Sequence, residues 1–230
     1  MRDDLLPRNV ADGERPRSSR KREEAKAFSK DQVKALLTAA GGERNHALYV
    51  VAVYTGLRQG ELLGLKWQDV ELGDRPKVSV RRSLETTAEG LRFGPPKNKA
   101  SRRSVPLTNN AAAALREHRR CQNEERLRAP EWYDHDLVFP NRAGKPMDHN
   151  NLYRREYKKL LKKAGLHDQG FTFHTRRHTF ATKLFHQGKR PKIIQTLLGH
   201  SSITQTMDTH SHLLEGVDGD EVGGLDEAFG

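Results

Sequence analysis

The sequence contains a single cysteine and no long apolar run, and both absences narrow the classes of protein to which it can belong. One cysteine, Cys121, excludes an internal disulfide and suits a reducing cytosol. No apolar stretch is long enough to cross a bilayer, and the N-terminal segment lacks the apolar core of a secretory signal. The sequence therefore predicts a cytoplasmic protein without a membrane span.

Acidic residues are also in short supply, because 41 Lys and Arg stand against 30 Asp and Glu. The formal net charge of +11 over 230 residues indicates a polyanionic partner, since opposite charge promotes association. Nucleic acid is the partner that this excess favours. An anionic membrane surface is the rival, but the chain has neither a lipidation signal nor an amphipathic terminal helix to support it.

Three segments differ in composition. Residues 1–26 are polar, basic and without periodicity, which predicts a linker; a simple basic tail is the alternative. Residues 27–214 carry the periodic apolar patterns of a folded domain. Residues 215–230 are acidic and Gly-rich and contain no Lys or Arg, so they predict a flexible C-terminal tail.

The folded domain has the sequence signals of a mainly α protein with a small antiparallel β-sheet, an α+β class. Ser29 and Gln32 form a capping box at the start of a helix that Gly41 closes. Two helices follow, separated at Thr55-Gly56. Alternation over residues 77–107, with turns at 89–90 and 95–96, predicts two or three antiparallel strands. Helices then return, including one over 150–166 with a strongly basic face and one that starts near Pro191.

Two clusters of charged residues could bind a phosphate. In "YTGLRQGELLGL", Arg58 follows a glycine turn at the start of a helix, and Glu61 lies one turn later, where it can orient the guanidinium. A surface ion pair is the ordinary alternative. In "PPKNKASRRSVPL", Lys97 and Lys99 are expected at the tip of a hairpin, where a solvated turn is the ordinary alternative.

A third cluster, "HTRRHTFAT", places His174, Arg177 and His178 on one helical turn. The spacing of the two histidines would suit zinc on a helix. The metalloprotease pattern, however, needs a Glu after the first histidine, and Thr175 stands there instead. A solvated histidine pair on a basic helix is the alternative.

Four blocks together carry a resemblance that none of them carries alone: "TGLRQGELLGLKWQDV", "PKNKASRRSVPL", "HTRRHTFAT" and "LLGHSSITQTMDTHSHL". In their order and spacing over residues 28–213 they resemble the catalytic domain of the tyrosine recombinases, the phage-type integrase family. The resemblance implies a bacterial or phage-encoded protein of DNA recombination. It also implies that an N-terminal DNA-clamping domain would join at residues 1–26.

The resemblance implies a role for each matching residue. Arg58 and Arg177 would bind the non-bridging oxygens of the scissile phosphate, and Glu61 would orient Arg58. Lys97 would protonate the leaving 5′ oxygen, with Lys99 the less favoured candidate. His174 would be the general acid/base, and His200 would donate a hydrogen bond to the phosphate. No metal or other cofactor is needed, because the arginines supply the positive charge.

His210 is the one departure from the family pattern, since it stands where the family has its tyrosine nucleophile. No tyrosine follows Tyr157, so another segment is not expected to supply one. Three interpretations compete: a site that binds DNA without cleaving it, a histidine nucleophile that forms a phosphoramidate, and hydrolysis by a water that His210 activates. The first is favoured, because the imidazole has a shorter reach than a phenol and misplacement slows attack.

The sequence thus predicts a site-specific recombinase catalytic domain that is cleavage-deficient, acting on double-stranded DNA. The alternatives are a non-catalytic protein that occupies a recombination site and, with less support, a metal-dependent hydrolase. DNA contacts are expected from six basic residues: Lys99, Arg102, Arg154, Arg155, Lys158 and Lys159. The resemblance also implies assembly as a tetramer on DNA, in which Leu225, Ala228 and Phe229 of the tail dock on a neighbouring protomer.

Overall fold

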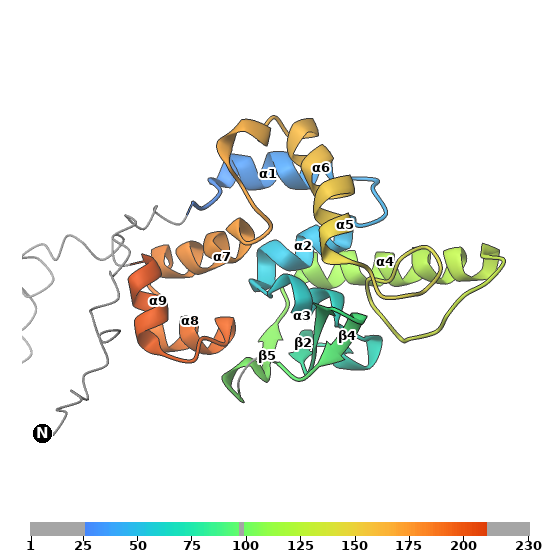
Figure 1. The fold of residues 1–230 in the computed structure, drawn as a ribbon. Helices are drawn as coiled ribbons and strands as arrows, with labels where there is room; N and C mark the ends of the chain where they lie inside the picture. The colour runs from blue at the N-terminus through green and yellow to red at the C-terminus, as the bar shows by residue number, and fades with distance from the viewer. Residues whose placement is uncertain (1–25, 97–98, 211–230) are drawn as a thin grey trace, which may run out of the picture.

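The computed structural model describes residues 26–96 and 99–210 (Figure 1). Its helices are α1 (Lys30–Ala39), α2 (His46–Thr55), α3 (Gln59–Leu63), α4 (Asn109–Arg128), α5 (His149–Asn151), α6 (Lys158–Lys163), α7 (Thr175–His186), α8 (Pro191–Leu198) and α9 (Ile203–His210). Its strands are β1 (Val70–Glu71), β2 (Lys77–Val80), β3 (Ser83–Thr87), β4 (Gly90–Gly94) and β5 (Arg103–Pro106). The mainly helical fold with small antiparallel sheets is the expected class. The expected tail, and all but Lys26 of the expected linker, lie outside the described residues.

The predicted start of α1 is confirmed. Ser29 accepts a hydrogen bond from the Gln32 backbone, and the Gln32 side chain accepts one from the Ser29 backbone, so both halves of the capping box form. The predicted end of this helix is wrong in detail. Ala40 is the C-cap in the right-handed region, and Gly42 rather than Gly41 takes the positive φ, +77°, that turns the chain.

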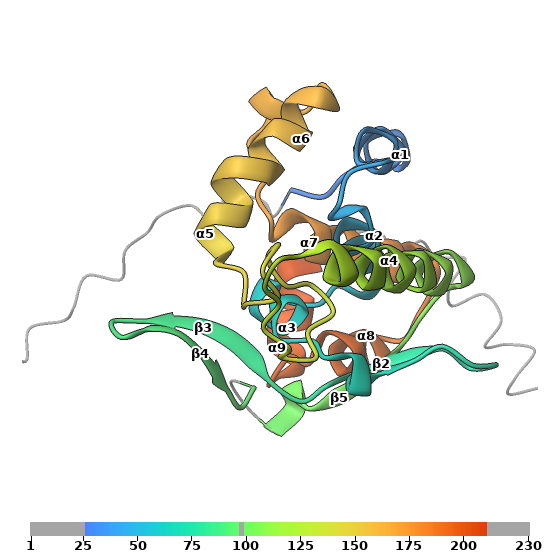
Figure 2. The same cartoon turned by 90° about the vertical axis from the view of Figure 1, so that its right-hand side faces the viewer.

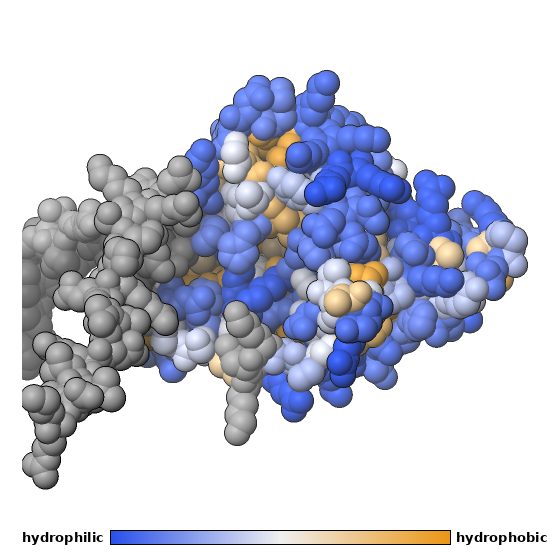
Figure 3. Space-filling model, viewed as in Figure 1, coloured by the Kyte–Doolittle hydropathy of each residue, from blue (hydrophilic) through white to orange (hydrophobic). Residues whose placement is uncertain are grey.

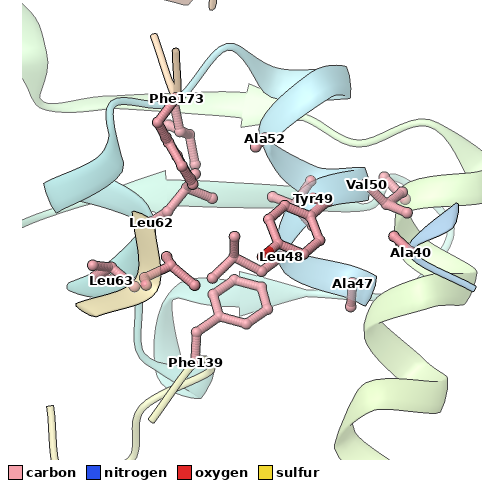
Figure 4. Close-up of a cluster of buried hydrophobic side chains, with 14 of the residues drawn as sticks. Ala40, Ala47, Leu48, Tyr49, Val50, Ala52, Leu62, Leu63, Phe139 and Phe173 are labelled. Atoms are coloured by element: carbon pink, nitrogen blue, oxygen red, sulfur yellow. The ribbon is translucent and has the colours of Figure 1, made fainter. Parts of the chain in front are cut away.

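Helix α2 is the centre of the core, and eight of its ten residues are buried. Figure 4 shows Leu48 and Tyr49 of α2 among Leu62, Phe139 and Phe173. The predicted break at Thr55-Gly56 is confirmed: Gly56 takes the left-handed conformation, with φ +61°, and ends α2. The chain can therefore turn directly into α3, whose first residue follows Arg58.

The sequence predicts one small antiparallel sheet, but the structure has two. Strands β1, β2 and β5 form one in the order β1-β2-β5, and β3 pairs with β4 in the other, both antiparallel. The ladder stops between β2 and β3, where Arg81 and Arg82 both form ion pairs with the buried carboxylate of Asp69. Arg81 and Arg82 thus lie outside both strands, between β2 and β3. The turn predicted at residues 89–90 is confirmed, since it joins β3 to β4.

The segment after Pro95-Pro96 is not the hairpin tip predicted from sequence. It connects β4 to β5, which belong to different sheets, and Lys99 starts a 3-10 turn (Lys99–Ser101) just before β5. A proline lacks the N–H that a continuing ladder needs, so the pair of prolines ends β4 instead of turning it back on itself.

The predicted basic helix is a continuous helical segment with an irregular centre. A π-helical stretch, Leu152–Tyr157, joins α5 to α6. Such wide turns are rare and often occur at functional sites. Figure 2 shows α5 and α6 above and the β3–β4 hairpin below, on the same side of the molecule. Gln59 connects α5 to the start of α3, because its side chain donates to the His149 carbonyl at 3.2 Å.

The apolar interior consists of two clusters. The large one packs α1, α2, α3, β2 and β5 against α4 and α6. A small one lies between α7 and α8 and is built on Ala181, Ile194 and Leu198. The visible face in Figure 3 is mostly hydrophilic, as the charge-rich composition implies. Across residues 26–96 and 99–210, no helix combines the length and apolar character needed to span a membrane.

Gly56 allows a test of how α2 meets the small cluster. A Cβ at this position would lie 2.6 Å from Phe180 Cδ1 and 3.1 Å from Leu198 Cδ2, in addition to the strain of a positive φ. We expect Gly56→Ala to lower the free energy of unfolding by about 1–2 kcal/mol for the left-handed backbone and a further ~1–3 kcal/mol for crowding. Urea denaturation measures the sum.

Gly188→Ala is the matched control, since Gly188 also has a positive φ, +67°, but no atom within 4 Å of an added Cβ. In this variant the free energy of unfolding should fall only by the contribution of the left-handed backbone. Equal losses in the two variants would show that α2 does not pack closely on α7 and α8.

Candidate active site

Glu61 is the centre of a buried charge cluster at the start of α3. Its side chain is 3% exposed and accepts two hydrogen bonds from Arg58, at 2.8 Å from the backbone N–H and at 2.9 Å from Nη1. The predicted pairing of Arg58 with Glu61 is therefore present in the structure. Because Arg58 remains 28% exposed, its guanidinium is both oriented by the carboxylate and accessible from solvent.

Arg103 is a second partner of Glu61 that sequence reasoning missed. Its Nη1 and Nη2 donate to the two carboxylate oxygens at 3.0 and 2.9 Å, and both side chains are 3% exposed. The sequence predicts a DNA contact from the neighbouring Arg102 instead, which is exposed. The strand alternation contained the signal: Arg103 lies two residues before the buried Val105, on the same face of β5.

Three arginines bind three successive carbonyls where α8 ends. Arg103 Nε donates to the carbonyl of residue 197 at 2.6 Å, Arg177 Nη2 to that of residue 198 at 2.6 Å, and Arg58 Nη2 to that of residue 199 at 3.2 Å. The last carbonyls of a helix lack intrahelical partners and carry partial negative charge, so cations are stabilising there. The blocks that contain Arg58, Arg103 and Arg177 thus converge directly before His200.

Gly199 makes this convergence sterically feasible. It is the C-cap of α8, with φ +65°, and a Cβ here would lie 2.8 Å from Arg103 Nη1 and 3.1 Å from the Ala100 carbonyl oxygen. Arg177 is anchored from the other side as well, because its Nη1 donates to the Gly56 carbonyl at 2.8 Å. The glycine C-caps of α2 and α8 therefore both accept hydrogen bonds from the arginines, Gly56 from Arg177 and Gly199 from Arg58.

The electrostatics of the cluster favour an anion. Burial acts to raise the pKa of Glu61, but the hydrogen bonds and positive charges of Arg103 and Arg58 outweigh it and lower the pKa below its usual value. Burial, followed by repulsion from Arg58, lowers the pKa of Arg177 to about 9, so it stays a cation at neutral pH. Three guanidinium groups around one carboxylate leave an uncompensated positive charge.

His174 is the N-cap of α7, and its side chain is at the surface. Partial loss of hydration, together with repulsion from His178, Arg177 and Arg58, lowers its pKa to about 4. The imidazole rings of His174 and His178 pack edge to face, with their centroids 4.7 Å apart. Within the part of the chain that the structure describes, no three His, Cys, Asp or Glu side chains form a group that could hold a metal ion.

His200 follows α8 and is buried. Its Nδ1 lies 2.9 Å from Oγ1 of the fully buried Thr206, which ties it to α9. His210 is the last residue of α9, but its side chain is outside the described part of the structure, as is that of Lys99. Lys97 lies outside the described residues altogether.

The other expected DNA-binding residues divide into two faces of one helical segment. Arg155 and Lys159 line a hollow of about 670 Å³ together with Arg142 and Lys163. Lys158 instead places its Nζ over the Tyr153 ring, 5.6 Å from the centroid. All four predicted residues of this segment, Arg154, Arg155, Lys158 and Lys159, are exposed.

The fold is that of a tyrosine recombinase catalytic domain, as comparison with solved structures shows. XerA recombinase matches with a TM-score of 0.63 and 29% identity over 82% of this chain and 61% of its own. The Tn1549 transposon integrase, solved in complex with a circular intermediate DNA, matches with a TM-score of 0.69 and 25% identity over 82% of this chain and 62% of its own.

The model of the phage integrase family matches residues 26–215, and the chain belongs to that family. A tyrosine recombinase XerC-like protein of Caldanaerobacter subterraneus is 38% identical over 83% of this chain. An integrase of Streptomyces ambofaciens is 35% identical over 81% of it. The chain covers 51% and 49% of these two relatives, about half of each.

The charge of Glu61 can be tested through the pH dependence of stability. Because the folded-state pKa of Glu61 is lowered, the stabilisation is present above pH 4.5 and is lost as the pH falls through the folded-state pKa. Glu61→Gln should therefore lower the free energy of unfolding by about 3–5 kcal/mol at pH 7, because it leaves buried arginines unpaired. The deficit should shrink as the pH is lowered below 4.5 in a denaturation series.

Glu131→Gln, at an exposed loop position, controls for the loss of one negative charge. It should change stability little at any pH. A Glu61→Gln deficit that stayed constant from pH 7 to pH 3 would mean that the carboxylate charge is not what stabilises the cluster.

Proposed function

We propose that this chain is the catalytic domain of a site-specific DNA recombinase whose arginine cluster binds the scissile phosphate, and that it is cleavage-deficient because His210 occupies the nucleophile position. The observation that carries the proposal is the convergence of Arg58, Arg177 and His200 at the end of α8. These residues come from three separate sequence blocks, and His174 lies one turn before Arg177 on the same helix.

A phosphodiester is the ligand that best fits the charge of this site. Arg58 is oriented by Glu61 yet partly exposed, and Arg177 is fixed by two carbonyls, so both forks are held before the ligand arrives. Preorganised cations stabilise the negative charge that accumulates on the phosphorus oxygens in the transition state. That the Tn1549 integrase was solved on DNA supports double-stranded DNA as the partner.

His174 and His200 have different tasks in this proposal. With a pKa of about 4, His174 is neutral at pH 7 and ready to accept a proton. A bound phosphate would raise that pKa by attraction, so the same imidazole could then donate the proton. Thr206 would donate its hydroxyl hydrogen to Nδ1 of His200, which would place the ring hydrogen on Nε2, the atom proposed to donate to the phosphate. Lys97 would protonate the leaving 5′ oxygen.

His210 decides between two functions. It ends α9, one helix after His200, at the position that the sequence resemblance assigns to the family's tyrosine. Without a phenol in this position, the domain would bind and orient a phosphodiester but not cleave it. A non-catalytic role, in which the protein occupies a recombination site or modulates active partners, is therefore the second candidate function.

The wider DNA contacts are part of the proposal. Lys99 and Arg102, with the exposed basic residues along α5–α6, would bind flanking phosphates and position the domain without reading sequence. The C-terminal tail, residues 215–230, would pass to a neighbouring protomer in a tetramer assembled on DNA.

Replacing His210 by tyrosine tests the proposal directly. His210→Tyr should form a covalent protein–DNA adduct on a nicked suicide substrate, because the phosphate-binding residues would already be in place. The adduct is measured by denaturing gel electrophoresis and should survive mild acid. The unmodified chain should form no adduct.

His210→Phe is the matched control, since it supplies the ring without the nucleophilic hydroxyl, and it should also form no adduct. An acid-labile adduct from the unmodified chain would identify a phosphoramidate and overturn the cleavage deficiency. DNA binding without any adduct from His210→Tyr would favour the non-catalytic function.

The two arginines can be tested in the same background. Arg58→Lys or Arg177→Lys, added to His210→Tyr, should slow adduct formation by about 100–1,000-fold, because a point charge replaces an oriented fork. Single-turnover rates at saturating DNA give the measurement. Arg128→Lys, at an exposed position of α4, is the control and should change the rate little. A wild-type rate in either test variant would remove that arginine from the site.

A further inference from the structure

Arg176, the residue before Arg177, is buried in the interior without an acidic partner. Its exposed fraction is 1%, and in residues 26–96 and 99–210 no carboxylate forms an ion pair with it. Its Nη2 donates to the Phe173 carbonyl at 2.7 Å, whereas Nε and Nη1 have no hydrogen-bond partner among the described atoms. Burial lowers the pKa of Arg176 to about 10, so it remains charged at neutral pH.

Three aromatic rings from three separate stretches of the chain lie around this guanidinium. Its Cζ lies 3.1 Å from the centroid of Phe173, 4.6 Å from that of Tyr157 and 5.9 Å from that of Tyr49. Tyr49 comes from α2 and Tyr157 from the end of the π-helical stretch, and these two rings also stack on each other at 6.1 Å. Figure 4 shows Tyr49 and Phe173 at the cluster of buried side chains. Aromatic faces attract the cation and replace part of its lost hydration.

The aromatic cage holds the chain just before His174. Arg176 binds the carbonyl of Phe173, and the Tyr157 hydroxyl donates to the carbonyl of Thr172 at 3.1 Å. Thr172 in turn starts the turn into α7, since its N–H donates to Thr175 Oγ1 at 2.9 Å. The two residues before His174 are therefore both fixed by side chains from the interior.

Stability alone does not explain a charge in this place. A buried guanidinium with unsatisfied N–H groups is costly, and apolar side chains of similar volume often stabilise such sites. We propose that Arg176 is a positioning residue of the phosphate-binding site, which fixes the entry to α7, and with it His174 and Arg177, and adds positive charge behind them. The proposal rests on the proposed function, because it assigns Arg176 to the same site.

The charges that face His174 define a readout that does not depend on DNA. They come from His178, Arg177 and Arg176 on its own helix and from Arg58 at the start of α3. Each of them lowers the pKa of His174. Burial remains the largest cause of the lowered pKa, so removal of Arg176 alone should raise that pKa by a small amount, in the absence of any substrate.

Arg176→Met is the test, since methionine is apolar, unbranched and adaptable. We expect an unfolding midpoint equal to or above that of the wild type, a raised His174 pKa in an NMR titration of the imidazoles, and a roughly 10- to 100-fold slower adduct formation in the His210→Tyr background. Arg128→Met, at an exposed position of α4, is the matched control and should change none of the three. An unchanged His174 pKa together with an unchanged rate would overturn the proposal.

Arg176→Lys tests positioning separately from charge. It keeps the cation but loses the planar fork, so the His174 pKa should stay near the wild-type value while adduct formation slows about tenfold. A wild-type rate in this variant would refute the positioning role. If His210→Tyr alone gives no adduct but Arg176→Met still raises the His174 pKa, the failure lies with the proposed function and not with the assignment of Arg176.

Discussion

The interaction on which the domain depends is the binding of three arginines to the carboxyl end of α8. Helix α8 packs on α7 through a small apolar cluster that is separate from the main core. Its last carbonyls are joined to the rest of the domain by Arg58 from α3, Arg103 from β5 and Arg177 from α7. One hydrogen-bond network therefore both holds α8 and α9 in position and assembles the candidate active site.

The negative charge of Glu61 offsets part of the repulsion among these arginines, because its carboxylate lies between them. Arg58 and Arg103 donate hydrogen bonds to its oxygens, and its charge also interacts with Arg177. A cluster with equal numbers of positive and negative charges would stabilise the fold without attracting an anion. Here the positive charge exceeds the negative, and the most exposed of the three guanidinium groups, that of Arg58, faces the surface. This excess of positive charge is the property on which the proposed phosphate site depends.

Local signals in the sequence predicted the local structure well. The capping box of α1, the glycine break after α2 and Pro191 at the start of α8 are each set by neighbours within four residues, and all three are present. The four sequence blocks also identified the family. What failed depended on distant partners. The division of the strands into two sheets, the pairing of Arg103 with Glu61 and the burial of Arg176 among three aromatic rings all involve residues that are distant in the sequence. None of these partners is visible from nearby sequence.

The position of α9 has a consequence for motion. Most of the domain is tied to α2, which is buried along nearly its whole length, whereas α9 is tied to the His200 side chain through Thr206 and packs on α8. Segments with few apolar contacts open at a lower free energy than the whole domain. Backbone amides of α9 should therefore exchange with solvent by local opening, while those of α2 exchange only on global unfolding. The end of α9, with residue 210, would then belong to the part of the domain that opens most readily.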